Sequence, residues 1–185
     1  MTNRFWRVVA TGGYCTHGET FLDPEHEVLW WAKGGKLKGE SPKRIAFLRS
    51  IVEQLPGPIE PIESRYIRLL YTDAEEIERM AERVPKESMA FARAMLRLKD
   101  DLPAFAASEC VYQGHCGEDA YLTFYDLRTC GEDVLELPED HIYKVELIDT
   151  WEMTRTVLLE QASGKTEIRL PAKEGMAVLA TKQNR

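Results

Sequence analysis

The second half of the sequence contains a series of short segments in which apolar and polar residues alternate, and this pattern constrains the fold more than any other feature. A period of two places the apolar side chains on one face of a β-strand. Turn sequences such as Gly117-Glu118-Asp119 and Ser163-Gly164-Lys165 separate the segments. The pattern predicts an antiparallel β-sandwich or open barrel of about eighty residues. The predicted strands are Glu109–Tyr112, Ala120–Tyr125, Val134–Leu137, Tyr143–Asp149, Arg155–Gln161, Thr166–Leu170 and Met176–Thr181.

Residues 1–56 predict a helix, a strand, a long loop and a second helix, in that order. The first helix, Arg4–Ala10, ends at the Gly12-Gly13 pair, a common stop signal. Tyr14–Glu19 then predicts a short strand that places Cys15, His17 and Glu19 on one face. The second helix, Ser41–Leu55, has apolar residues at helical spacing, with Ser41 as its N-cap and Pro42 as its first residue. This order is half of the βα unit from which parallel (β/α)8 barrels are built.

Residues 57–107 predict a linker followed by a pair of helices. Three prolines between Leu55 and Pro61 favour an extended linker. Arg65–Tyr71 is either a strand or a buried extended segment, and Ala74–Arg83 and Pro85–Lys99 predict the two helices. The sequence thus predicts an α+β protein with three parts: a barrel-like unit at 1–56, a helical insertion at 57–107 and an antiparallel β-sandwich at 108–185.

Composition excludes two classes of partner. The 185 residues are 44% hydrophobic and 30% charged, which is ordinary for a globular protein, and the net charge is -7. A negative chain does not suit nucleic-acid phosphates, which need clustered Lys and Arg. No apolar run is long enough to span a membrane and no signal peptide follows Met1, so we expect a cytoplasmic protein. The four cysteines are expected to be free thiols.

Several stretches resemble one known family over about thirty-eight positions. The stretches are Phe5-Trp6-Arg7, Gly12-Gly13-Tyr14, Thr16-His17-Gly18-Glu19-Thr20, the segment from Leu29 to Gly35 that contains Trp30-Trp31, and the segment from Gly39 to Arg49. They resemble the last part of the barrel in bacterial glycoside hydrolase-like proteins of the apiosidase or collagenase-like type. Tyr143–Thr154 and the closing Leu170-Pro171 and Ala177-Val178-Leu179 are similar to the β-sandwich that follows this barrel.

The resemblance implies a role for each end of the chain. Tyr14–Glu19 would be the eighth barrel strand, and Ser41–Leu55 the eighth helix. In this family the acid/base carboxylate follows the fourth strand and the nucleophile the seventh, both of which would precede Met1. Because glycoside hydrolysis needs both carboxyl groups, no catalytic residue is expected here. We expect a C-terminal fragment that is not a competent hydrolase alone and that associates with a second copy or a complementing barrel chain.

Candidate substrate-binding residues lie in the second half of the predicted strand and in the loop before the second helix. His17 and Glu19 would contact sugar hydroxyls at the mouth of a barrel, or His17 would bond to backbone and leave Glu19 exposed. Trp30 and Trp31 would supply a ring that stacks on a sugar, or would pack in the core. Lys33 would reach the same pocket, pair with Glu40 or remain solvated.

No cofactor or metal is expected. Cys15 with His17, and Cys110 with His115, Cys116 and Cys130, lack the closely spaced ligand pairs of zinc sites. His115 and His141 are expected in turns, and His26 in the long loop, as surface residues. A second hypothesis for the chain is a binding module in which the β-sandwich, or the Trp30-Trp31 loop, holds a carbohydrate or a partner protein.

Overall fold

The computed structural model describes residues 1–16, 39–62, 86, 111–127 and 129–183. The chain divides into two compact units, one made of Met1–Ile62 with Tyr112–Arg185 and the other of Glu63–Val111. All helices and strands below belong to the first unit. They are α1 (Thr2–Ala10), α2 (Ser41–Val52), β1 (Glu60–Pro61), β2 (Tyr112–Cys116), β3 (Ala120–Phe124), β4 (Glu132–Glu136), β5 (Tyr143–Asp149), β6 (Thr154–Ala162), β7 (Lys165–Arg169) and β8 (Met176–Lys182).

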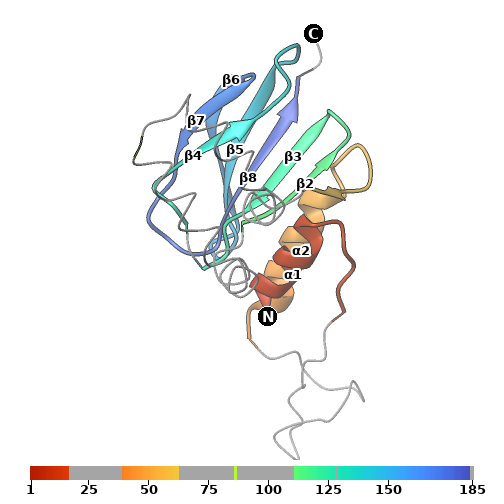
Figure 1. Ribbon diagram of the computed structural model, residues 1–185. Helices are drawn as coiled ribbons and strands as arrows, with labels where there is room; N and C mark the ends of the chain where they lie inside the picture. Colours follow the sequence, from red (N-terminus) through yellow and green to blue (C-terminus); the bar gives the residue numbers. More distant parts are fainter. Residues whose placement is uncertain (17–38, 63–85, 87–110, 128, 184–185) are drawn as a thin grey trace, which may run out of the picture. The chain divides into compact units, whose positions relative to one another are not determined.

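The described strands form two antiparallel sheets. The larger has the order β1-β2-β3-β8-β5-β6, and the smaller pairs β4 with β7. In Figure 1 the two helices lie beside β2 and β3, and the β4–β7 pair lies near β5 and β6. This arrangement confirms the predicted α+β class with a sheet-rich C-terminal region. Among the described residues, no helix is long and apolar enough to cross a membrane.

Strand β8 occupies the middle of the larger sheet because both of its faces are apolar. Its residues Met176 to Ala180 are all at most 3% exposed. A strand that is buried on both faces reads as a continuous apolar run instead of an alternating one. Ala177 and Leu179 belong to the core cluster beneath the helices, so Met176, Val178 and Ala180 point to the opposite face.

The core on the helical side is organised around Trp6. This side chain is 0% exposed and stacks on Phe124 of β3, with 5.6 Å between ring centroids. Phe5, Leu48 and Ile51 pack in the same cluster with Leu122 of β3. The expected association with another chain would use an exposed apolar barrel surface around Phe5, Trp6, Phe47 and Leu48. That expected surface is wrong, because Phe5, Trp6 and Leu48 are buried in this cluster and Phe47 packs against it.

Helix α1 confirms the predicted first helix and its stop. It begins at Thr2, earlier than expected, and ends at Ala10, with Gly12 at φ +76° in the left-handed region that glycine accepts readily. Asp126, after β3, holds the helix on the sheet: its carboxylate pairs with the Arg7 guanidinium and accepts a 2.9 Å hydrogen bond from the Asn3 side-chain amide.

The strand predicted at Tyr14–Glu19 is not formed in its described part. Tyr14 to Thr16 have no regular secondary structure, and Tyr14 is fully exposed. These residues pair with none of the described strands, so the described part of the segment lacks the inter-strand hydrogen bonds that define a strand. His17 to Glu19 lie outside the described residues.

Helix α2 confirms the second predicted helix with different ends. Glu40 occupies the N-cap position without a side-chain hydrogen bond, so Ser41 is the first helical residue and not the cap. The helix ends at Val52, because Glu53 and Gln54 already form a turn before Pro56. The expected extended linker contains a short strand, β1, whose Glu60 pairs with His115. Proline at position 61 is tolerated there because β1 is an edge strand.

Most predicted strands of the C-terminal part are present within one or two residues of their expected ends. Tyr143–Asp149 coincides with β5, and β6, β7 and β8 each begin or end within one residue of prediction. The exception is Glu109–Tyr112: β2 runs from Tyr112 to Cys116, Val111 has no regular structure, and Glu109 and Cys110 lie outside the described residues. His115 therefore lies in a strand and not in a turn. Arg65–Tyr71 and the helices Ala74–Arg83 and Pro85–Lys99 fall outside the described residues, apart from Lys86.

Candidate functional site

The residues predicted to contact a sugar lie outside the part of the chain that the structure describes. They are His17, Glu19, Trp30, Trp31 and Lys33. Their roles and their mutual positions stay predictions. The site described below is a different one.

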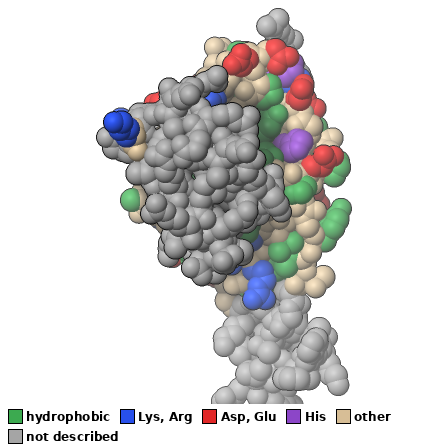
Figure 2. Space-filling view, viewed as in Figure 1, with side chains coloured by type: hydrophobic (Ala, Val, Ile, Leu, Met, Phe, Trp, Pro, Cys, Tyr) green, Lys and Arg blue, Asp and Glu red, His purple; other side chains and the backbone are tan. Residues whose placement is uncertain are grey.

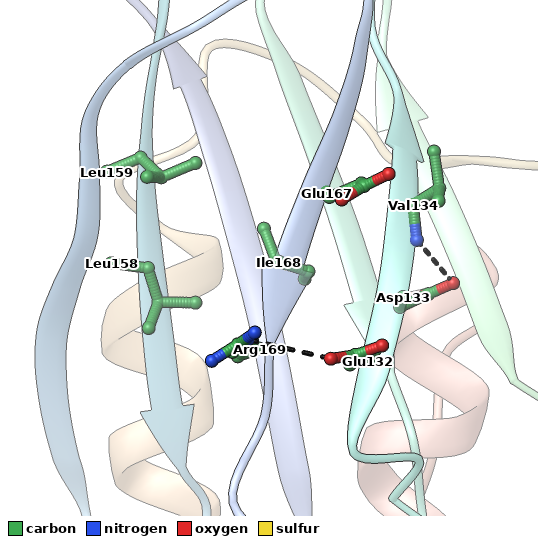
Figure 3. Close-up of a pocket in the computed structure, with 8 residues that line it drawn as sticks. All are labelled: Glu132, Asp133, Val134, Leu158, Leu159, Glu167, Ile168 and Arg169. Atoms are coloured by element: carbon green, nitrogen blue, oxygen red, sulfur yellow. Dashed lines mark hydrogen bonds and ion pairs between the residues drawn. The ribbon is translucent and has the colours of Figure 1, made fainter.

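A cavity of about 670 Å³ lies between β6 and the β4–β7 pair (Figure 3). Its size is within the usual range for small-ligand sites, roughly 300–1,000 Å³. Aliphatic and charged side chains both line it. The lining residues are Glu132, Asp133 and Val134 of β4, Leu158 and Leu159 of β6, and Glu167, Ile168 and Arg169 of β7.

An irregularity in β6 brings two neighbouring leucines to the cavity. Neighbours in a regular strand point to opposite faces. Here Val145 of β5 pairs with Leu159, and the next residue, Glu146, pairs with Val157, so Leu158 is an extra residue on β6. Such a bulge re-aims side chains, and in Figure 3 Leu158 and Leu159 both project toward β7. The two leucines form an apolar wall on β6, and Ile168, which is 4% exposed, adds an apolar side chain from β7.

The wall formed by β4 and β7 carries the charged side chains. The register between these two strands determines which charged residues lie opposite one another. Glu132 is opposite Arg169, and their side chains form an exposed ion pair with 3.5 Å between Arg169 Nε and Glu132 Oε1. Glu167 is opposite Val134 and makes no ion pair with any described residue. The wall therefore carries more negative than positive charge.

Asp133 is held in place by its own hydrogen bonds. Its Oδ2 accepts a 2.8 Å bond from the hydroxyl of Tyr125, a side chain that is 1% exposed, and its Oδ1 accepts a 2.8 Å bond from the N–H of Val134. Asp133 thus anchors β4 to the end of β3. Glu132, Glu167 and Arg169 are exposed and are the charged groups that a ligand would meet.

The lining suits binding more than catalysis. Apart from its carboxylates, it holds no histidine, cysteine, serine or threonine that could act as a nucleophile or a near-neutral base. It also has no aromatic ring on which a sugar could stack. An aliphatic wall facing a carboxylate-rich wall fits a ligand that is apolar on one side and cationic on the other.

A second polar cluster joins β3, β5 and the loop between β2 and β3. The buried Tyr143 donates a 2.6 Å hydrogen bond from its hydroxyl to the Glu118 carbonyl, and His141 Nε2 lies 3.1 Å from Glu118 Oε2. Burial, followed by the charges of Tyr121 and Glu118, raises the pKa of Tyr143 far above its ordinary value. Figure 2 shows the histidines beside acidic side chains on this edge. Since each polar group has an internal partner, the cluster is structural.

The described cysteines and acidic residues form no metal site that geometry supports. In the ranges given above there is no group of three or more His, Cys, Asp or Glu side chains that could hold a metal ion. Cys15 and Cys116 are free thiols, as predicted. Burial raises the pKa of the Cys116 thiol above its ordinary value, which makes this thiol a poor nucleophile at neutral pH.

Sequence reasoning missed the cavity because its residues come from three separate strands. One signal was available: Val157-Leu158-Leu159 interrupts the alternation expected of β6 with three consecutive apolar residues. A broken period inside a strand is typical of a bulge. The charges of β4 and β7 gave no signal, because alternating charged residues are equally typical of a solvated face.

Comparisons with known proteins place the fold. The family described as "Domain of unknown function (DUF5605)" matches residues 109–181. A search of curated proteins finds no match. A solved structure from Bacteroides vulgatus, described as a "putative glycoside hydrolase", matches with a TM-score of 0.59 and 23% sequence identity. The match covers 95% of this chain and 30% of that one, so the chain shares the fold of a segment that makes up less than a third of a longer protein.

Proposed function

We propose that this chain is the C-terminal part of a bacterial glycoside hydrolase-like protein of the apiosidase type. In this proposal residues 1–56 supply the last βα unit of a (β/α)8 barrel, and residues 108–185 form the β-sandwich appended to it. The catalytic carboxylates belong to other βα units, so the 185-residue chain by itself does not hydrolyse glycosides.

One observation carries the proposal. The chain is similar in fold, over 95% of its length, to 30% of the Bacteroides vulgatus protein described as a "putative glycoside hydrolase". The independent support is the family resemblance in the sequence, which occurs near both ends of the chain and in the same order as in the family. The packing of α1 and α2 against the larger sheet also suits a sheet module that is built onto the end of another domain.

Within the proposed barrel, His17, Glu19, Trp30, Trp31 and Lys33 contact the substrate. His17 and Glu19 lie at the end of the proposed last strand, and the other three lie in the loop after it; the loops after barrel strands form the active-site rim. Their function is to bind and orient a sugar, with Glu19 and His17 on its hydroxyls and a tryptophan ring on its apolar face. They do not supply the acid or the nucleophile.

The test compares this chain with the longer reading frame expected to contain it. We expect the gene region before the Met1 codon to encode further βα units with two carboxylates, and the joined protein to release the dye from aryl glycosides. The 185-residue chain should show no turnover. In the joined protein, Trp30→Ala and Trp31→Ala should raise KM more than they lower kcat. Turnover by the 185-residue chain that Glu19→Gln abolishes would make Glu19 catalytic and overturn the proposal.

A second candidate function is a binding module, and the cavity between β6 and β7 favours it. The cavity is lined by residues of the sheet-rich part alone and needs no barrel. Its lack of aromatic rings favours a protein ligand over a carbohydrate. Ligand-induced changes in the amide NMR signals of β6 and β7, without any glycosidase activity, would support this function.

A further inference from the structure

We propose that the cavity between β6 and β7 binds an extended segment of a partner protein that carries an aliphatic residue flanked by lysine or arginine. The inference rests on the binding-module function and is independent of the glycoside hydrolase assignment. Three features of the cavity argue for it: two open strand edges, an apolar wall, and an excess of carboxylates.

The first feature is that β6 and β7 belong to different sheets although only Ser163 and Gly164 separate them. Such a short connection normally joins two paired strands of a hairpin. In the described part of the chain, however, β6 pairs only with β5, β7 pairs only with β4, and no backbone hydrogen bond joins β6 to β7. Each strand thus has an edge available to an added strand, which is how extended peptides bind to open sheets.

The bulge at Leu158 indicates whether a short peptide segment or a second copy of the chain would pair with the open edge of β6. Two copies would pair through β6 only if this edge were regular over most of its nine residues. The extra residue bends the strand and disrupts the ladder there, and bulges of this kind protect edge strands against edge-to-edge association. A second register shift follows Leu159, so the regular part of the edge is Thr154–Val157. Four residues are enough for a short peptide beside the leucines, so the irregular edge favours a short segment as the occupant.

The second feature is the apolar wall. Leu158 and Leu159 are half-buried, and Ile168 is almost completely buried. An aliphatic side chain placed among them would be removed from water together with the exposed parts of the leucines. Burial of such a side chain is favourable because it removes apolar surface from water, and this gives the segment an anchor residue.

The third feature is the charge. Two exposed carboxylates, those of Glu132 and Glu167, line the cavity, against one exposed guanidinium, that of Arg169. Arg169 is paired with Glu132, and Glu167 has no ion pair within the described ranges. The whole chain is also negative, at -7. Basic residues beside the anchor would therefore be attracted to the cavity, and acidic residues would be repelled.

The experiment uses the whole chain and three synthetic peptides. The probes are acetyl-Lys-Val-Lys-Val-Lys-amide, the same peptide with glutamate at each lysine, and the same peptide with serine at each valine. Amide NMR signals of the protein are followed during titration. We expect the first peptide to shift the signals of Leu158, Leu159, Glu167 and Ile168, and the other two to bind at least tenfold more weakly.

Two variants test the charge. Glu167→Gln should weaken binding of the lysine-valine peptide about two- to fivefold, the range for one exposed ion pair, and Glu167→Lys should weaken it further. Glu160→Gln is the matched control, because Glu160 is an exposed carboxylate of β6 that does not line the cavity. It should leave the affinity unchanged.

The outcomes distinguish the binding-module function from the more specific claim that the partner segment is aliphatic and basic. If the glutamate peptide binds as well as the lysine peptide, the partner's chemistry is wrong but the binding module stands. If no peptide shifts the cavity signals, the binding-module function fails as well. If those signals instead shift with protein concentration when no peptide is present, a second copy of the chain is the occupant and the proposal is overturned.

Discussion

The guanidinium of Arg44 lies over the indole ring of Trp151, 4.4 Å from the ring centroid, and its Nε donates a 3.0 Å hydrogen bond to the Trp151 carbonyl. Arg44 belongs to α2, and Trp151 belongs to the turn between β5 and β6. The contact therefore joins α2 to the β5–β6 turn, at the end of the larger sheet that lies opposite β1.

Replacing Arg44 should loosen this attachment. Arg44→Met keeps much of the aliphatic stem but removes the cation and the donor, and we expect it to lower the free energy of unfolding by about 1–2 kcal/mol. Arg44→Lys should recover part of the loss, because it keeps a charge near the ring but not the planar donor. Urea denaturation measures both variants. A methionine variant as stable as the parent would show that the contact contributes nothing.

The Gly175 backbone is predicted to tolerate no side chain. Its φ is +73°, and a Cβ there would lie 2.5 Å from Cδ1 of Trp151. Gly175→Ala should therefore combine backbone strain with a steric clash, at a total cost of about 2–5 kcal/mol. Thermal denaturation should show a correspondingly lower midpoint.

Gly117 provides the matched control for that substitution. It also has a positive φ, +54°, but a Cβ there would meet nothing within 4 Å. Gly117→Ala should therefore show only the strain, about 1 kcal/mol. Equal losses at the two positions would mean that the contact with Trp151 has no energetic effect.

Truncation of Trp6 should be the most damaging of these changes. Trp6→Ala removes a fully buried ring that stacks on Phe124, for which we expect a loss of about 3–5 kcal/mol. Trp6→Phe should cost less, since a ring remains and the indole N–H makes no hydrogen bond to a described residue. Leu127→Ala, at a side chain that is 58% exposed, should change stability by less than about 0.5 kcal/mol. Similar losses for Trp6→Ala and Leu127→Ala would contradict the described core.

Asp149 should make stability depend on pH in the acid range. Burial alone would raise the pKa of this carboxyl, but hydrogen bonds from Lys173 at 2.5 Å and from the N–H groups of Glu152 and Trp151 outweigh it and lower the pKa. A lowered pKa contributes stability that is complete above the unfolded-state value, near 3.8, and is lost as pH falls through the folded-state value.

We therefore expect Asp149→Asn to be less stable than the parent at neutral pH and to lose less stability on acidification. Urea denaturation at a series of pH values from about 7 to about 2 would show the two curves converging. Glu152→Gln is a suitable control, because Glu152 is exposed and lies farther from Lys173, at 3.9 Å. Parallel curves for Asp149→Asn and the parent would rule out this role of Asp149.

The sequence predicts which residues form strands better than it predicts how the strands pair. Alternation locates β5 at its exact ends, because the period of two depends only on local burial. It does not reveal that β8, the last strand, lies between β3 and β5. The continuous apolar run from Met176 to Ala180 was the available signal, since only a central strand is buried on both faces.

The prediction was wrong in two places where residues were expected outside a strand. His115 was expected in a turn, but it lies in β2 next to Gly114, a strand residue that lies against the Ala10 carbonyl and Ile59. Pro61 suggested a linker, but it lies in an edge strand, where a missing N–H costs little. In both cases tertiary contacts overrode local preference. The candidate cavity could not be predicted for a related reason: its walls meet only after the two sheets have formed.

The contact at Gly114 also bears on how the molecule could be divided. A Cβ at this position would collide with the end of α1 and with β1, so residues 10, 59 and 114 meet where there is room only for hydrogen. A piece that began after residue 108 would lack α1 and α2, which cover Leu122, Phe124 and Leu179. It would expose an apolar sheet face to solvent. Anyone who trims this protein to its sheet should expect inclusion bodies unless the amino-terminal helices are supplied in trans.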